Sequence, residues 1–369
     1  MPSMNPRRAW VTVVLLALGI LLVVWALAAY LEARRERAEP RFLDVWKIDA
    51  HERADPDALA LAMNLAATQR IRGLVDYAGG HVGDGLEARV AAAARFPGRV
   101  AVFMELDLEG CCGEAWSGRE VVRMVQGRAG GARGLSVPGD LGLSVRDGAG
   151  RRVAVDAPEL EPIWDMAWRL ELPVAVHALP GPGSPPVGTG GASGEDGRAR
   201  AKGWQAALDE FVRVVERHPQ VSFIASRFAN DAEDPAEVAR LLDRLPNLYV
   251  DTASCLEELG RKPEPTRAAI LAHADRVLFG TGLRFLPGPK PDLNAVVLGL
   301  GRPARSVAEI RRFFESTWRF FESRDAGIPA PAPDGTGTLE GLGLPRTVLE
   351  KVYHANAERL LGFRAPESN

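Results

Sequence analysis

The chain has 369 residues, a formal net charge of −3 and 25% charged residues. This balanced charge gives no sign of a nucleic-acid partner, and the length suits one large domain or two small ones. Three cysteines, Cys111, Cys112 and Cys255, are an odd number without zinc-ribbon spacing, which excludes a disulfide framework. We interpret them as buried or incidental thiols.

Residues 9–30 form an uncharged apolar segment near the N-terminus. A run of about 20 apolar residues is long enough to span a bilayer as a helix. Trp10 and Tyr30 lie near its ends, where aromatic rings favour the membrane interface. We therefore predict a transmembrane anchor at 9–30, between a tail at 1–8 and a juxtamembrane linker at 31–41.

A cleaved signal peptide is the alternative for this segment. The "ALA" at 26–28 resembles a cleavage site, but the apolar run exceeds the usual signal-peptide core of about 7–15 residues. Arg7 and Arg8 favour a cytoplasmic N-terminus, which predicts a single-pass membrane protein with its domain outside the cytoplasm. Four arginines on the other flank favour the opposite orientation: Arg34, Arg35, Arg37 and Arg41.

Short apolar runs recur after Arg41. Most are continuous rather than alternating, which is typical of strands buried on both faces of a parallel sheet. The predicted strands are 42–49, 71–77, 99–106, 132–137, 172–178, 221–226, 247–252 and 276–281.

Segments with apolar residues at helical spacing separate these strands. They are 56–70, 84–96, 117–129, 158–171, 203–218, 235–245 and 263–273. Eight strand–helix repeats predict an α/β fold, a (β/α)8 TIM barrel over residues 42–363, followed by a tail at 364–369. An open doubly wound sheet is the alternative, but no Gly-rich phosphate turn follows the first strand.

Two insertions interrupt the pattern. Residues 181–197 are rich in Gly, Pro and Ser, which predicts a mobile loop after the fifth strand, either a plain linker or a lid over the active-site face. Residues 327–345 predict a second loop. It leads into a closing helix that starts at Pro345 and ends at Gly362, as helix capping favours.

Polar residues stand at the carboxyl ends of the predicted strands, where side chains of a TIM barrel face the active site. In strand order they are Asp49, His51 and Arg53; Asp76; Glu105 and Asp107; Ser136; His177; Arg227; Asp251; and Thr281 with Gly282.

Several stretches, in this order, resemble the amidohydrolase superfamily from about Ile48 to Gly362. They include "IDAH", "GARGLSV", "NDAEDPAEVARLLDRLPNLYVDTAS", "DRVLFGTG" and "LPRTVLEKVYHANAERLLG". The branch is the amidohydrolase-related or aminocarboxymuconate-decarboxylase-like one. The resemblance implies a catalytic divalent metal, usually zinc, that activates a water. It also implies the ligands: two histidines after strand one, one after strand five, often one after strand six, and an aspartate after strand eight.

This sequence departs from that ligand set at most positions. His51 and His177 match the first and the strand-five ligands, whereas Arg53 replaces the second histidine. Arg227 stands at the strand-six position and Gly282 replaces the aspartate. Ser136 stands where close relatives often have lysine.

These substitutions act on one site. A guanidinium stays protonated and has no lone pair for a metal, and two histidines alone are too few ligands for catalytic zinc. We therefore predict that the metal hydrolase site does not work here and that His51 and His177 are remnant ligands.

The remaining polar residues have structural interpretations as well. Arg53 is expected to pair with Glu52, Asp49 or Asp251, because a buried arginine needs a partner. Glu105 and Asp107 are expected to partner arginines rather than act as acid or base. Glu105 and Asp251 remain weak catalytic candidates.

Three hypotheses follow. In the first, a membrane-anchored protein without hydrolase activity binds a small anionic ligand through Arg53, Arg227 and Ser136, because arginine binds carboxylates and phosphates bidentately. In the second, a rearranged site around His51 and His177 binds zinc or another divalent metal and is an active hydrolase or decarboxylase. In the third, the outer barrel surface serves a structural or interaction role. No cofactor is expected in the first hypothesis, and a homo-oligomer is compatible with the sequence.

Overall fold

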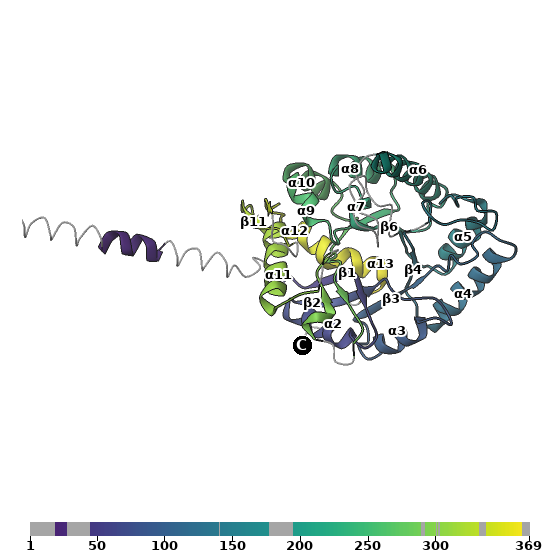
Figure 1. The fold of residues 1–369 in the computed structure, drawn as a ribbon, viewed down its shortest axis with the longest axis horizontal. Coiled ribbons are helices and arrows are strands. Elements are labelled where there is room, and N and C mark those ends of the chain that lie inside the picture. Colours follow the sequence, from purple (N-terminus) through teal and green to yellow (C-terminus); the bar gives the residue numbers. More distant parts are fainter. Residues whose placement is uncertain are drawn as a thin grey trace, which may run out of the picture. The chain divides into compact units, whose positions relative to one another are not determined.

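The computed structural model describes residues 19–27, 45–139, 141–176, 195–288, 292–299, 301, 303–331 and 337–363 (Figure 1). The chain divides into two compact units, 1–41 and 42–369. In the first unit, residues 19–27 are helical, and the rest of the predicted anchor lies outside the described residues. Of the helices described, none combines the length and apolar character that crossing a bilayer requires.

Eight strands of the second unit lie parallel, each beside the next in chain order, as predicted. They are β1 (Lys47–Ala54), β2 (Ile71–Asp76), β3 (Val100–Glu105), β4 (Gly134–Val137), β5 (Val174–Val176), β6 (Phe223–Ala225), β7 (Leu248–Asp251) and β8 (Val277–Leu278). Two short strands, β9 (Arg284–Phe285) and β10 (Val296–Val297), continue the sheet beside β1.

Helices follow the strands and surround them (Figure 1). The predicted helices are α2 (Leu59–Thr68), α3 (Leu86–Ala93), α4 (Trp116–Gly130), α5 (Glu161–Arg169) after the turn η1 (Pro158–Leu160), α6 (Glu195–Arg217), α8 (Pro235–Arg244) and α10 (Pro263–Ala272). Shorter elements add to them: α7 (Ser226–Ala229), α9 (Leu256–Arg261) and the turn η2 (Leu293–Ala295). Helix α6 begins inside the predicted insertion at 181–197, so its last three residues are helical; His177 and residues 181–194 lie outside the described residues.

The segment after β8 contains structure that the sequence pattern did not predict. Helix α11 (Val307–Glu322) begins after Ser306, whose hydroxyl accepts a hydrogen bond from the Glu309 amide at 3.2 Å. The second predicted loop contains an antiparallel pair, β11 (Ile328–Pro329) and β12 (Thr338–Leu339). The closing helix is confirmed as α12 (Arg346–Glu350), a π-helical turn η3 (Lys351–Ala355) and α13 (Asn356–Leu361).

Backbone hydrogen bonds join the chain after β8 to β1. The Ala50 amide donates to the Phe279 carbonyl at 2.8 Å, and the Gly282 amide donates to the His51 carbonyl at 3.0 Å. The end of β8, the last parallel strand, therefore bonds to β1, the first, so the series of strands closes on itself. This is the arrangement of a TIM-barrel-like fold, whereas an open doubly wound sheet ends in two free edges.

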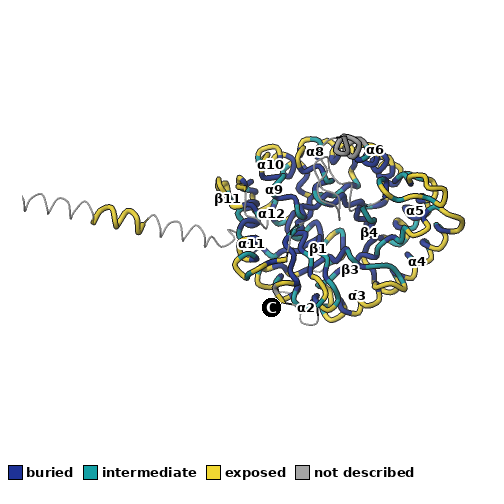
Figure 2. The backbone as a smooth tube through the Cα atoms, in the orientation of Figure 1, coloured by how far each residue is buried: buried dark blue, intermediate teal, exposed yellow. Residues whose placement is uncertain are grey.

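Two apolar layers alternate along the strands, as expected for side chains that point to opposite faces. One layer packs inside the ring of strands: Ile48, Val75, Phe103, Ala175, Ile224 and Leu278. The other packs between strands and helices, so buried residues gather on the strands and on the inner sides of the helices (Figure 2). Leu361 and Phe363 join the inner layer near the strand starts, where Phe363 lies against Gly73. The carboxyl ends of the strands are left for a site.

Candidate functional site

The alternation of side chains identifies the inward-facing positions at the carboxyl ends of the strands. Each lies two residues beyond a member of the inner layer, or beyond Gly134, where an added Cβ would lie 2.3 Å from the Phe103 ring. These positions are Tyr77, Glu105, Ser136, Ser226, Asp251 and Gly280. By this alternation Tyr77, rather than the neighbouring Asp76, faces inward at the end of β2. Ser226 stands at the inward position directly after β6, one residue before Arg227.

A one-residue bulge in β1 brings His51 into this ring. Asp49 is opposite Leu74 but Glu52 is opposite Asp76, so three steps along β1 match two along β2. The bulge lets His51 lie on the inner side, where its ring meets that of Tyr77 edge-on with centroids 4.7 Å apart.

His51 and Asp251 form a buried pair. Nδ1 of His51 lies 2.9 Å from Oδ2 of Asp251, and the two side chains are 9% and 0% exposed. The other carboxylate oxygen of Asp251 accepts hydrogen bonds from the amides of Arg227 at 2.9 Å and Ala253 at 3.0 Å. Asp251 thereby connects the ends of β1, β6 and β7, and it orients the imidazole of His51.

Asp49 joins β1 to the end of β8 instead of facing the mouth. Its Oδ1 accepts hydrogen bonds from the amides of Thr281 at 2.9 Å and His51 at 3.2 Å, and its Oδ2 accepts one from the Thr281 hydroxyl. Burial raises the pKa of Asp49 to about 6. Burial and the neighbouring Asp49 carboxyl also raise the pKa of Glu52 well above its ordinary value.

Arg227 opens a left-handed turn at the end of β6. The φ angles of Arg227, Phe228, Ala229 and Asn230 are 56°, 54°, 57° and 52°. None of the four is glycine, and the left-handed conformation costs about 1–2 kcal/mol for each non-glycine residue. The hydrogen bond from the Arg227 amide to Asp251 offsets part of this conformational cost. The guanidinium lies 3.4 Å from the Ser254 carbonyl and 3.9 Å from the Glu258 carboxylate.

Arg53 is half-buried and lies opposite Arg284 of β9 in the strand register. The predicted pairing of Arg53 with Glu52, Asp49 or Asp251 is absent from the residues that the structure describes, because Asp49 binds Thr281 and Asp251 binds His51. The sequence analysis did not select Arg284 as a site residue. The only sign of it in the sequence is one charged residue inside the short apolar stretch "GLRFL".

Gly282, at the predicted strand-eight position, has no room for a side chain. Its φ is +71°, and an added Cβ would lie 2.0 Å from Oγ and 3.0 Å from N of Ser254. Cβ atoms are not found so close to other atoms, so an aspartate here would require Ser254 and its backbone to move.

Two buried hydroxyl groups have no hydrogen-bond partner among the described residues. They belong to Ser136 and Ser226, each 1% exposed, at the ends of β4 and β6. Buried polar groups are rarely left without a partner, so these hydroxyls are available to a bound ligand or water. Glu105, at the inward-facing position of β3, is half-buried. Its backbone amide donates a hydrogen bond to the Gly80 carbonyl at 2.7 Å.

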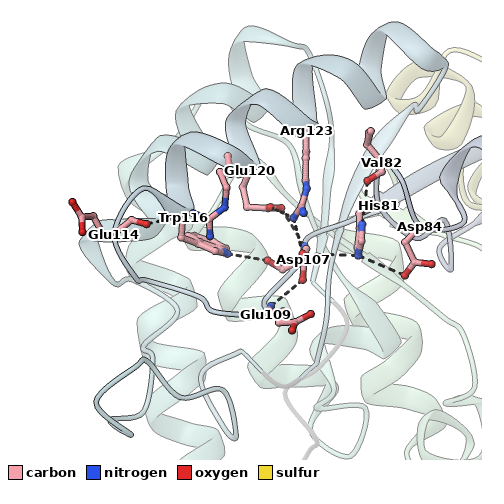
Figure 3. Close-up of polar contacts among 10 residues, drawn as sticks. His81, Val82, Asp84, Asp107, Glu109, Glu114, Trp116, Glu120 and Arg123 are labelled. Atoms are coloured by element: carbon pink, nitrogen blue, oxygen red, sulfur yellow. Dashed lines mark hydrogen bonds and ion pairs between the residues drawn. The ribbon is translucent and has the colours of Figure 1, made fainter.

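Asp107 belongs to a separate cluster in the loop between β3 and α4 (Figure 3). Its carboxylate lies 2.6 Å from Arg123, and its carbonyl accepts the Trp116 indole N–H at 3.1 Å. Arg123 also bonds Glu120, whose Oε2 accepts the Asp107 amide at 3.3 Å. Nε2 of His81, from the loop after β2, approaches the Asp107 carboxylate at 3.9 Å. Asp107 thus partners Arg123 of α4, which is neither of the arginines expected at the site.

A family model described as amidohydrolase matches residues 26–363. The chain belongs to the amidohydrolase family. A search of curated proteins found none that matches this amidohydrolase-family chain.

Three solved structures illustrate the likeness. An uncharacterized TIM-barrel protein from Bordetella bronchiseptica is 18% identical with a TM-score of 0.51, over 86% of this chain and 98% of that one, which supports the TIM-barrel-like fold. A putative amidohydrolase from Staphylococcus aureus is 15% identical with a TM-score of 0.47, over 86% and 99% of the two chains. A 4-oxalomesaconate hydratase from Rhodopseudomonas palustris is 12% identical with a TM-score of 0.49, over 83% and 81%.

Members of the amidohydrolase family often use a divalent metal, so the donor set of this member matters. Across the described part of the chain, no group of three or more His, Cys, Asp or Glu side chains could hold a metal ion. Nδ1 of His51 is bound to Asp251, and Arg53 and Arg227 bring positive charges near the mouth. These residues do not fit the metal set that the resemblance implies. His177, its remaining histidine, lies outside the described residues.

Proposed function

We propose that this amidohydrolase-family protein does not catalyse metal-dependent hydrolysis and binds a small anionic ligand in the mouth of the barrel. The observation that carries the proposal is the chemistry at three positions implied to be metal ligands. Two of them are arginines, Arg53 and Arg227, and the third, Gly282, cannot carry a side chain beside Ser254.

The electrostatics at the mouth favour an anion over a cation. A guanidinium offers only N–H donors and repels a divalent cation, whereas it binds carboxylate or phosphate through two parallel hydrogen bonds. The unpartnered Ser136 hydroxyl supplies a further donor in the inward-facing ring. The inward-facing Asp251 is already hydrogen-bonded by His51 and by two amides.

A metal analysis of the full-length chain tests the first half of the proposal. After exposure to excess zinc or manganese and removal of loosely bound ions, we expect far less than one equivalent of metal by mass spectrometry. His51→Ala should leave that content unchanged. One tightly held equivalent that His51→Ala abolishes would contradict the proposal.

A rearranged active site is the second candidate function, and the His51–Asp251 pair favours it. A carboxylate 2.9 Å from an imidazole orients that ring for metal binding or proton transfer. In this version His51 and His177 hold a metal and the protein acts as a hydrolase or decarboxylase. The metal analysis separates the two candidates, because only this one requires a metal equivalent that depends on His51.

We also propose that residues 9–30 anchor the protein in a membrane as a single span, with the barrel outside the cytoplasm. The length and uncharged character of the segment support an anchor, and Arg7 and Arg8 support the orientation. In this arrangement the ligand would reach the barrel from outside the cytoplasm.

A further inference from the structure

Two arginines stand together at the edge of the mouth. Arg53 of β1 and Arg284 of β9 are opposite one another in a parallel strand pair, so their side chains leave the sheet on the same side. Arg53 follows His51 by two residues beyond the bulge, which places the pair next to the His51–Asp251 pair. Burial lowers the pKa of Arg284, and the charge of Arg53 lowers it further, so the two cations interact.

Neither guanidinium has a carboxylate partner among the described residues. Nε of Arg284 is buried and has no hydrogen-bond acceptor there. Two nearby acids are bound elsewhere: Asp76 pairs with Arg89 at 2.9 Å, and Asp251 with His51. Two like charges held together at a half-buried position repel each other, and a buried donor without an acceptor adds a further cost.

The backbone on both sides holds the two arginines in place. The Arg53 amide donates to the Leu283 carbonyl at 3.0 Å, and β9 also pairs with β10, where Val297 is opposite Arg284. A pair of cations kept together by strand pairing, instead of separated by it, is the arrangement expected of a preorganised anion site.

We infer that Arg53 and Arg284 together bind an oxyanion with two negative charges, a dicarboxylate or a phosphate dianion. Two guanidiniums match two charges, and each offers a fork of N–H donors to two oxygens. This inference rests on the proposed function and names a different pair of arginines from the one that the sequence predicted. Arg227 lies against Ser254 and Glu258 and is not required for the dianion.

Calorimetric titration of the full-length protein at constant ionic strength tests the inference. We expect inorganic phosphate or succinate to bind and raise the melting temperature, and monovalent acetate or chloride to have no such effect. Phosphate binding more tightly than succinate would assign a phosphate ligand, and the reverse would assign a dicarboxylate. Constant ionic strength separates binding from general screening of the two charges.

Substitutions distinguish this pair from the rest of the mouth. Arg284→Met and Arg53→Met should each weaken dianion binding tenfold or more, and Arg284→Lys should weaken it less, because it keeps the charge but loses the fork. Arg312→Met, on the exposed face of α11, removes the same charge and should change nothing. Without anion, Arg284→Met should be at least as stable as the wild type, because it relieves repulsion.

The outcomes separate this inference from the function on which it rests. Dianion binding that survives Arg53→Met and Arg284→Met but is lost in Arg227→Met would overturn the inference and keep the proposed anion-binding function. Absence of any anion binding to the wild-type protein would overturn both. If Arg284→Met does not fold, Arg284→Lys and Arg53→Met carry the same comparison.

Discussion

At position 282 the backbone itself opposes the aspartate that the resemblance implies. The φ of +71° suits glycine, and the direction that a Cβ would take is filled by the hydroxyl and amide of Ser254. The absence of a carboxylate at this position is therefore favoured by the local backbone as well as by the residue itself. An aspartate placed here by substitution alone would meet Ser254.

Gly282→Ala should lower the free energy of unfolding by about 2–4 kcal/mol, because it adds both an unfavourable φ and a steric overlap. Gly98→Ala is the matched control. Gly98 has the same φ of +71°, but nothing lies within 4 Å of the position of an added Cβ. Gly98→Ala should therefore lower the free energy of unfolding by only about 1 kcal/mol. Urea unfolding of both variants measures the difference in the free energy of unfolding. Equal decreases in the two variants would show that Ser254 moves aside at no cost.

At the level of elements, Asp107 in the loop between β3 and α4 has two possible roles, one in the active site and one in holding the loop. From its place after β3, Asp107 is a candidate for the active site. Its carboxylate instead pairs with Arg123 of α4, beside the buried Glu120 (Figure 3). The charge of Arg123 pairs with both Asp107 and Glu120, so this arginine of α4 holds the loop against the helix.

Arg123→Met should destabilise the protein by about 1–3 kcal/mol, because it leaves the buried Glu120 beside Asp107 without a cation. Arg119→Met is the control on the same helix, since Arg119 is exposed and reaches only the Glu114 carbonyl at 3.4 Å. Thermal unfolding gives the comparison. Anion binding should be unaffected in both variants, and a loss of binding in Arg123→Met alone would return Asp107 to the functional site.

At the scale of the whole molecule, the two compact units have different roles in the proposal. The barrel, within residues 42–369, would carry the ligand site, and residues 9–30 would fix it to a membrane. The affinity of the barrel for its ligand is then independent of the anchor. The anchor instead determines the compartment in which the barrel meets the ligand.

The full-length chain should stay in the membrane pellet after alkaline carbonate extraction, and its N-terminus should be intact by mass spectrometry. Ile20→Arg together with Val23→Arg should release it, because an arginine at the centre of a span costs about 2.5–3.5 kcal/mol. Ser3→Arg, outside the span, should not. A mature N-terminus just after Ala28 would instead identify a cleaved signal peptide.

Much of the fold was predictable because burial on both faces leaves a local mark. The eight strands appear as continuous apolar runs, and the helix from Pro345 to Gly362 carries its own capping residues. Helix α11 was missed, although the Ser306 and Glu309 spacing is a capping-box signal. The site was less predictable, because one bulge in β1 changes which side chains face inward.

The sequence by itself determined the family, the order of strands and the residues Arg53, Arg227 and Gly282, since these depend only on residue identity and local pattern. The tertiary structure alone decided which charges meet. It placed His51 on Asp251, Asp49 on Thr281 and Arg53 beside Arg284. Those partners lie about 200 or more residues apart, and strand register brings them together by backbone hydrogen bonds that no local pattern encodes.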